Sequence, residues 1–200
     1  TYTVKYEGFK NGDNKDELGG ALVFDCGYTQ FSDKGEYAIK ASGYTSGNYT
    51  ISYVDGKLTV NAKPITVTIQ NATSIYGDAL AELKATDNGI VNGDTSVYSL
   101  ATTATGTSNV GKYAITGTAL DDNYAITFES GEYEITKREI TITVDAKNTV
   151  VNTALPTYTY KVEGLVGVDT LVTEPTLTCN ANIAVIGEYD ITATGADAGG

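Results

Sequence analysis

Apolar and polar residues alternate along several short segments of this chain, which is the pattern of β-strands with one buried face. In the clearest segment, threonines separate the apolar residues Ile65, Val67 and Ile69. The same pattern returns from Ile140 to Val144, 75 positions later (140 − 65). Because side chains alternate between the two faces of a strand, we expect Ile65, Val67 and Ile69 to face a core.

Longer phrases also recur at this spacing. A Gly-x-Tyr-x-Ile phrase appears three times, with its glycine and tyrosine at Gly35 and Tyr37, Gly111 and Tyr113, and Gly187 and Tyr189. Self-similarity at a fixed period marks a tandem array of like modules rather than one enzyme-sized domain. We therefore predict a partial first repeat over residues 1–62, a complete middle repeat over 63–137 and a partial last repeat over 138–200.

Each repeat also contains a glycine-rich bend that ends in an acidic residue. The three acids are Asp13, Asp94 and Asp169. Asp at such a place usually accepts hydrogen bonds from backbone N–H groups, either in an Asx turn or at the cap of a helical turn. We therefore interpret these aspartates as structural residues rather than ligand-binding ones, and a short helical turn fits near the bend.

Two further glycines predict hairpins that close the repeats. Asp55-Gly56 and Ser130-Gly131 each stand between two alternating segments, and such dipeptides favour tight turns because glycine accepts a positive φ. With the other segments, they predict an all-β fold of small antiparallel modules with five or six strands each. A compact sandwich and a β-grasp-like sheet fit this pattern equally well.

The linkers at residues 60–65 and 135–140 are short and contain no Gly/Ser coil. Short joints of this kind restrict rotation between neighbouring repeats, so the sequence predicts a stiff, extended rod. The first repeat lacks its opening strand and the last lacks its closing hairpin. Because edge strands without partners invite pairing, we expect weaker order at both ends or strand exchange with another copy.

These phrases resemble the MBG-type repeats, mostly β and rich in glycine, that occur in tandem in large bacterial cell-surface proteins. The resemblance rests on Tyr76-Gly77-Asp78, the bend from Gly89 to Asp94, Gly111-x-Tyr113-x-Ile115, Asn123-Tyr124-x-Ile126 and Gly131. The last repeat departs from it at Val151-Asn152-Thr153, where the Tyr-Gly-Asp turn is lost. The resemblance implies an extracellular stalk or adhesin repeat without catalytic residues.

Charge and composition narrow the possible partners. The net charge is −12, with 25 acidic and 13 basic residues, so phosphate backbones and anionic lipids would be repelled. No stretch approaches the roughly 18 apolar residues that a membrane-spanning helix needs. We therefore expect neither nucleic-acid binding nor membrane insertion, and the predicted partners are the neighbouring repeats and a possible host glycan or extracellular protein.

Few residues are candidates for catalysis, metal binding or cofactor binding. The sequence has no histidine, which excludes Ser–His and Cys–His nucleophile pairs and every histidine-containing metal site. Cys26 and Cys179 occupy matching positions in different repeats, so we expect two half-buried free thiols rather than a disulfide. No phosphate-binding glycine loop is present. The sequence thus predicts neither an enzyme nor a cofactor.

Two small sets of residues are candidate binding sites. Asp121 and Asp122 offer hard oxygen ligands to calcium, although a solvated turn explains them as well. Recurring tyrosines indicate packing within the module. The unrepeated tyrosines Tyr28, Tyr44 and Tyr98 remain as candidates for ligand contact.

The sequence as a whole predicts a non-catalytic spacer segment of a bacterial cell-surface or adhesin-like protein, located outside the cell on its surface or secreted. One alternative is an adhesive module that binds host glycan or protein. Another is an accessory domain of a secreted glycan-degrading enzyme.

Overall fold

The structure is a computed structural model that describes residues 2–199. Thr1 and Gly200, at the ends of the first and last predicted repeats, lie outside the described residues. The described residues form strands and one short 3-10 helix, with no α-helix, so the all-β prediction is confirmed. Within this range, no helix is long and apolar enough to cross a membrane.

The first repeat contains one antiparallel sheet of three strands, in the order β1-β2-β3. The 3-10 helix η1 (Lys15–Glu17) precedes β1 (Gly19–Cys26), which is followed by β2 (Gly35–Thr45) and β3 (Gly56–Val60). The pairing of β1 and β2 shifts register after Gly20. Gly20 has φ +80, and a Cβ there would lie 2.2 Å from the carbonyl oxygen of Gly43, so only glycine fits.

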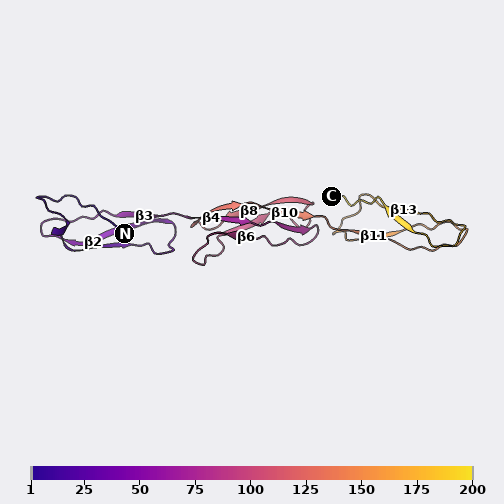
Figure 1. The fold of residues 1–200 in the computed structure, drawn as a ribbon, viewed down its shortest axis with the longest axis horizontal. Coiled ribbons are helices and arrows are strands. Elements are labelled where there is room, and N and C mark those ends of the chain that lie inside the picture. Colours follow the sequence, from indigo (N-terminus) through magenta and orange to yellow (C-terminus); the bar gives the residue numbers. More distant parts are fainter. Residues whose placement is uncertain (1, 200) are drawn as a thin grey trace. The chain divides into compact units, whose positions relative to one another are not determined.

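The middle repeat contains two sheets, in the orders β5-β10-β8-β7 and β6-β4-β9. Figure 1 shows β8 beside β10, with which it pairs. Two sheets in one repeat are typical of a sandwich and not of a single β-grasp sheet. One pair in these otherwise antiparallel modules is parallel, since β10 pairs in parallel with β5. The strands are β4 (Lys63–Ile69), β5 (Ala72–Ile75), β6 (Ala85–Asp87), β7 (Tyr98–Thr102), β8 (Gly111–Ala119), β9 (Tyr124–Glu129) and β10 (Gly131–Thr136).

The last repeat contains two antiparallel pairs, β11 with β12 and β13 with β14. An isolated bridge joins Thr173 to Asp197. The strands are β11 (Thr141–Val144), β12 (Tyr160–Glu163), β13 (Thr176–Cys179) and β14 (Ile191–Thr194).

The two predicted hairpins do not form. β9 ends at Glu129 and β10 begins at Gly131, but the two strands belong to different sheets, and residues 48–53 form no strand. Neither Gly56 nor Gly131 has the positive φ that we expected. A Cβ on Gly131 would lie 2.8 Å from the carbonyl oxygen of Ile69, so the close approach of β4 explains this glycine. Alternation fixes which face of a strand is buried but not which strand it pairs with, and the local pattern was therefore misleading.

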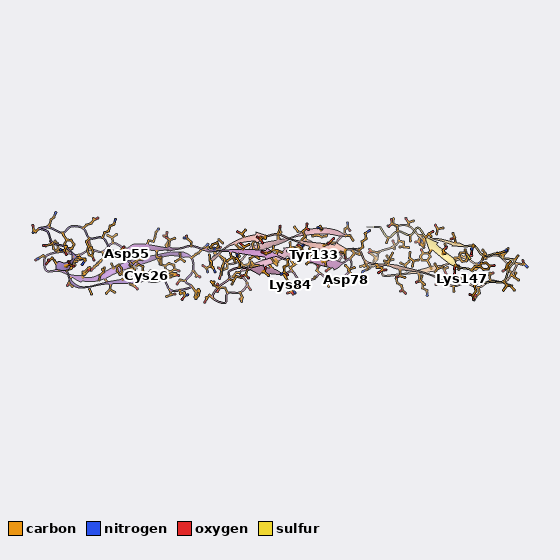
Figure 2. The ribbon with its side chains drawn as sticks, in the orientation of Figure 1. Cys26, Asp55, Asp78, Lys84, Tyr133 and Lys147 are labelled. Atoms are coloured by element: carbon orange, nitrogen blue, oxygen red, sulfur yellow. The ribbon has the colours of Figure 1, made fainter. Side chains whose placement is uncertain are left out.

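The core lies between the two sheets of the middle repeat. Ile65, Val67 and Ile69 are 4%, 0% and 5% exposed, which confirms that this face of β4 is buried. Tyr133 and Ile135 on β10 are fully buried, and Figure 2 shows Tyr133 among the strands of this repeat. Among the described residues, all buried hydrophobic side chains of the core belong to the middle repeat: Ile65, Val67, Ile69, Val97, Ala104, Ile115, Tyr124, Tyr133 and Ile135.

The chain divides into two compact units, and the division passes through the middle repeat. One unit contains the chain up to Val67 with Asp87–Ser99 and Thr118–Thr127, and the other contains Thr68–Thr86, Leu100–Gly117 and the chain from Phe128 onward. The linker at 60–65 therefore lies inside the first unit and the linker at 135–140 inside the second. Each joint between repeats therefore lies within a single compact unit.

Candidate functional site

The glycine-rich bends share one backbone geometry. In each bend, the N–H of the final aspartate donates to the carbonyl three residues earlier, at 3.0 Å. Asn-Gly in the first two bends has positive φ at both residues, as a tight primed turn requires. The three hydrogen bonds join Asp13 to Lys10, Asp94 to Val91 and Asp169 to Val166.

The aspartate side chains of the first two bends accept hydrogen bonds from tyrosine. The hydroxyl of Tyr49 donates to Asp13 at 2.6 Å, and the hydroxyl of Tyr124 donates to Asp94 at 2.6 Å. Our expectation that these carboxylates accept backbone N–H groups is therefore replaced by a tyrosine–aspartate pair within each repeat. The hydrogen bond to the carboxylate raises the pKa of both tyrosines, because it stabilises the protonated phenol.

The third aspartate accepts a tyrosine from the preceding repeat instead. The hydroxyl of Tyr76, in the middle repeat, donates to Asp169 Oδ2 at 3.0 Å. This hydrogen bond is the main cause of the raised pKa of Tyr76. It joins the Tyr-Gly-Asp turn of the middle repeat to the bend of the last one.

The other two residues of this turn also belong to the joint. Gly77 has φ +87, and a Cβ there would lie 2.3 Å from a methyl carbon of Val166 in the last repeat. The carboxylate of Asp78 pairs with the guanidinium of Arg138 in the linker. Arg138 Nε also donates to the carbonyl of Tyr76 at 2.7 Å. Every residue of the Tyr-Gly-Asp phrase therefore contributes to one joint.

The turn survives in the last repeat although its sequence is different. Asn152 has φ +63 where the middle repeat has Gly77, and both residues donate a backbone hydrogen bond of 2.6 Å to the loop that precedes the Gly-x-Tyr strand region. The expectation that the loss of Tyr-Gly-Asp removes this turn was wrong. Asn replaces glycine here because its side chain tolerates the left-handed region.

Asn123 holds the joint between the first and middle repeats. Its side-chain oxygen accepts from the backbone N–H of Lys34 at 2.7 Å, and its side-chain nitrogen donates to Asp33 at 2.8 Å. Its backbone carbonyl accepts from the N–H of Lys63 in the linker at 2.7 Å. One residue of the Asn-Tyr phrase thus binds the preceding repeat and the linker together.

The two candidate calcium ligands lie at this same joint. Asp121 accepts from the backbone N–H of Asn123 at 2.8 Å, and Asp122 forms an ion pair with Lys34 at 3.3 Å. In the part of the chain that the structure describes, no group of three or more His, Cys, Asp or Glu side chains could hold a metal ion. The geometry therefore gives both aspartates a role in the turn and the joint.

The recurring tyrosines of the Gly-x-Tyr phrase pack within their own repeats. Each ring is half-buried, and each hydroxyl donates to the carbonyl four residues earlier. The distances are 2.7 Å for Tyr37 to Asp33, 2.7 Å for Tyr113 to Asn109 and 3.5 Å for Tyr189 to Val185. The two half-buried cysteines, Cys26 and Cys179, are free thiols near the ends of β1 and β13.

The unrepeated tyrosines do not share one contact. Tyr28 lies edge-on to Tyr37 with ring centroids 5.6 Å apart, whereas the Tyr44 hydroxyl is 3.0 Å from that of Tyr6. Tyr98 is half-buried on β7. The contacts at the joints converge on a few residues, whereas these three tyrosines do not form one site. Sequence reasoning located the two linkers but missed the contacts that hold them, although the only arginine of the sequence, Arg138, lies in one linker.

Comparison with known families gives one match. The model of the MBG domain (YGX type) matches three tandem segments, residues 1–59, 65–134 and 140–199. The phrase Tyr76-Gly77-Asp78 fits the YGX of that description. No curated protein and no solved structure is significantly similar to the chain.

Proposed function

Because this chain belongs to the MBG domain family (YGX type), we propose that it is a non-catalytic spacer segment of a bacterial cell-surface protein. In this proposal the stiffness of the joints sets the distance between the parts of the protein on either side. The partners are the neighbouring repeats of the same chain, and the location is extracellular.

The observation that carries this proposal is that hydrogen bonds at each joint connect the two flanking repeats and also hold the linker to one of them. At one joint, Asn123 binds both the first repeat and Lys63 of the linker. At the other, Arg138 of the linker and Asp169 of the last repeat bind the same Tyr-Gly-Asp turn. A flexible tether does not need such contacts, whereas a spacer that transmits position does.

Several contacts act together at each joint. Most of them are exposed to solvent, and an exposed ion pair contributes only about 0–1 kcal/mol. The stiffness that we propose therefore comes from their combination and not from any single bond. The close contact of Gly77 with Val166 adds a steric limit to rotation.

Distance distributions across one joint test the proposal. We would replace both native cysteines with threonine, the residue of the middle repeat at that place, and attach spin labels at Lys84→Cys and Lys147→Cys. Both lysines are exposed and lie inside the second compact unit (Figure 2). A spacer gives a narrow distribution that broadens in the Tyr76→Phe/Arg138→Ala variant. A broad distribution in the starting protein, unchanged in the variant, would rule out a stiff joint.

One observation favours adhesion as a second candidate function. The first repeat contains a group of aromatic ring contacts, in which Tyr6 meets both Phe9 and Tyr44. Tyr6 and Tyr44 have no tyrosine counterparts in the other repeats. Aromatic faces bind sugars by stacking, so this surface suits a glycan.

Binding of the chain to immobilised mucins, glycans and matrix proteins tests this second candidate. Saturable binding that is lost in Tyr44→Ala and retained in Tyr189→Ala would support adhesion through the first repeat. No binding at concentrations up to about a millimolar, which corresponds to only about −4 kcal/mol, would leave the spacer as the function.

A further inference from the structure

The first and middle repeats close their sheets in the same register. β3 pairs with β2 from Gly35 opposite Val60 to Ile39 opposite Gly56. β10 pairs with β8 from Ile135 opposite Gly111 to Gly131 opposite Ile115. The two pairs correspond residue by residue, so either closing strand has the backbone geometry to pair with either Gly-x-Tyr strand.

The apolar residues of the two closing strands do not distinguish them either. Leu58 and Val60 in β3 correspond to Tyr133 and Ile135 in β10, and both strands begin with glycine. Neighbouring repeats of one chain are always at high local concentration. Strand exchange between them is therefore a characteristic error in the folding of repeat proteins.

The charged residues on the other face do distinguish them, because their signs are reversed. In the first repeat, Lys57 on the closing strand pairs with Glu36 at 2.6 Å. In the middle repeat, Glu132 on the closing strand pairs with Lys112 at 2.8 Å. Glu36 corresponds to Lys112, and Lys57 corresponds to Glu132, so the same cross-strand ion pair is present with opposite polarity.

The alternation continues into the last repeat. The position of Glu36 and Lys112 is occupied there by Glu188, and the position opposite the closing-strand charge is Asp190. The three Gly-x-Tyr segments thus read acidic, basic and acidic along the chain, and the first two of them lie in strands β2 and β8. Each differs in sign from its neighbour.

We propose that this alternating charge matches each Gly-x-Tyr strand to the closing strand of its own repeat and prevents exchange between adjacent repeats. If β3 paired with β8 in this register, Lys57 would lie diagonal to Lys112. If β10 paired with β2, Glu132 would lie diagonal to Glu36 and Glu134 would lie directly opposite it. Like charges across a strand pair are unfavourable, so both errors replace an attraction with a repulsion.

The same alternation of charge disfavours pairing of β10 with the Gly-x-Tyr segment of the last repeat. Placed in the register that it has on β8, Glu132 would lie opposite Asp190 and diagonal to Glu188. A closing strand with a lysine at this position, as in β3, would instead form an attractive pair.

The test distinguishes an effect of the alternating charge on the choice of strand partner from an effect of the ion pair on stability. The Lys112→Glu/Glu132→Lys variant keeps the diagonal ion pair and the net charge but gives the middle repeat the polarity of the first. Glu134 lies directly opposite Lys112 and would repel a glutamate there, so the starting protein of this test and both variants carry Glu134→Thr, the residue of the first repeat at this position. The matched control adds Glu36→Lys/Lys57→Glu, which restores opposite polarity between these two repeats. Each protein is refolded from denaturant at low salt, and the fraction of dimeric and misfolded product is measured by size-exclusion chromatography with light scattering.

We expect the first variant to give about three- to tenfold more misfolded product than the starting protein. Each exposed charge pair has only a small effect on strand pairing, but the exchange involves two strand pairings and the two effects add. The four-fold variant should return to the starting level. About 1 M salt should remove the difference between the proteins, because it shortens the Debye screening length to about 3 Å. Equal misfolding of the starting protein and the first variant at low salt would overturn the proposal, as would an increase that the four-fold variant does not reverse.

Discussion

The middle and last repeats share their phrases but differ in how well they bury them. Ile115 on β8 is 2% exposed, whereas its counterpart Ile191 on β14 is half-buried. In the middle repeat, β10 lies between β5 and β8 and brings Tyr133 into the core. Among the described residues, the last repeat has no strand that corresponds to β10. An alternating strand therefore becomes a core strand only when a partner covers its apolar face.

Truncation of the two matched isoleucines should give the largest difference between these repeats. We expect Ile115→Ala to destabilise the middle repeat by about 2–5 kcal/mol, because a buried methyl-rich side chain leaves a cavity. Ile191→Ala should cost the last repeat about half of that or less, since its side chain is already partly exposed. Hydrogen exchange of the strand amides, read separately for each repeat, measures both values. Equal losses would show that the last repeat has a complete core.

Substitution of Gly77 should weaken the joint between these two repeats. Gly77→Ala places a Cβ against Val166 and in the left-handed region, so we expect a loss of about 1–3 kcal/mol. The double variant with Val166→Ala should recover part of this loss, because the clash is relieved while the backbone strain remains. Urea unfolding checks both, and a Gly77→Ala variant as stable as the starting protein would contradict the contact.

High pH should affect the tyrosine–aspartate pairs. The pKa values of Tyr49, Tyr76 and Tyr124 are raised in the folded state by their aspartate partners. The stabilisation is therefore fully present below the unfolded tyrosine pKa of about 10 and is lost as the pH rises through the higher folded-state pKa.

Tyrosinate absorbance and thermal unfolding between about pH 8 and 12 measure this effect. The Tyr124→Phe variant should be less stable at neutral pH and should lose less stability as the pH rises. Tyr28→Phe removes an exposed tyrosine hydroxyl that belongs to none of these three pairs, and this variant serves as the control. A pH dependence unchanged in Tyr124→Phe would show that the pair with Asp94 does not contribute.

The smallest effect should come from the exposed ion pair at the first joint. The Asp122 side chain is 95% exposed, so Asp122→Asn should change the free energy of unfolding by less than about 1 kcal/mol. Asn123→Ala, one residue on, should cost more because it removes the hydrogen bonds to Asp33 and Lys34. Urea unfolding of the two variants compares them directly. A larger loss in Asp122→Asn would reverse the roles that we assign to these neighbours.

The sequence by itself determined the repeats, the all-β fold and the buried face of β4. These features follow from alternation and from recurrence, which depend on local spacing alone. Val67 could be placed in the core because its neighbours in sequence fix the face on which it lies.

Only the tertiary structure decided which strands pair and which contacts the recurring phrases make. Gly131 resembled a hairpin turn, yet it marks the passage of the chain from one sheet to the other. Asp169 accepts a hydrogen bond from Tyr76, 93 residues away, and no local pattern predicts that partner. Pairing and joints depend on contacts between distant segments, and hydrophobic periodicity does not specify them.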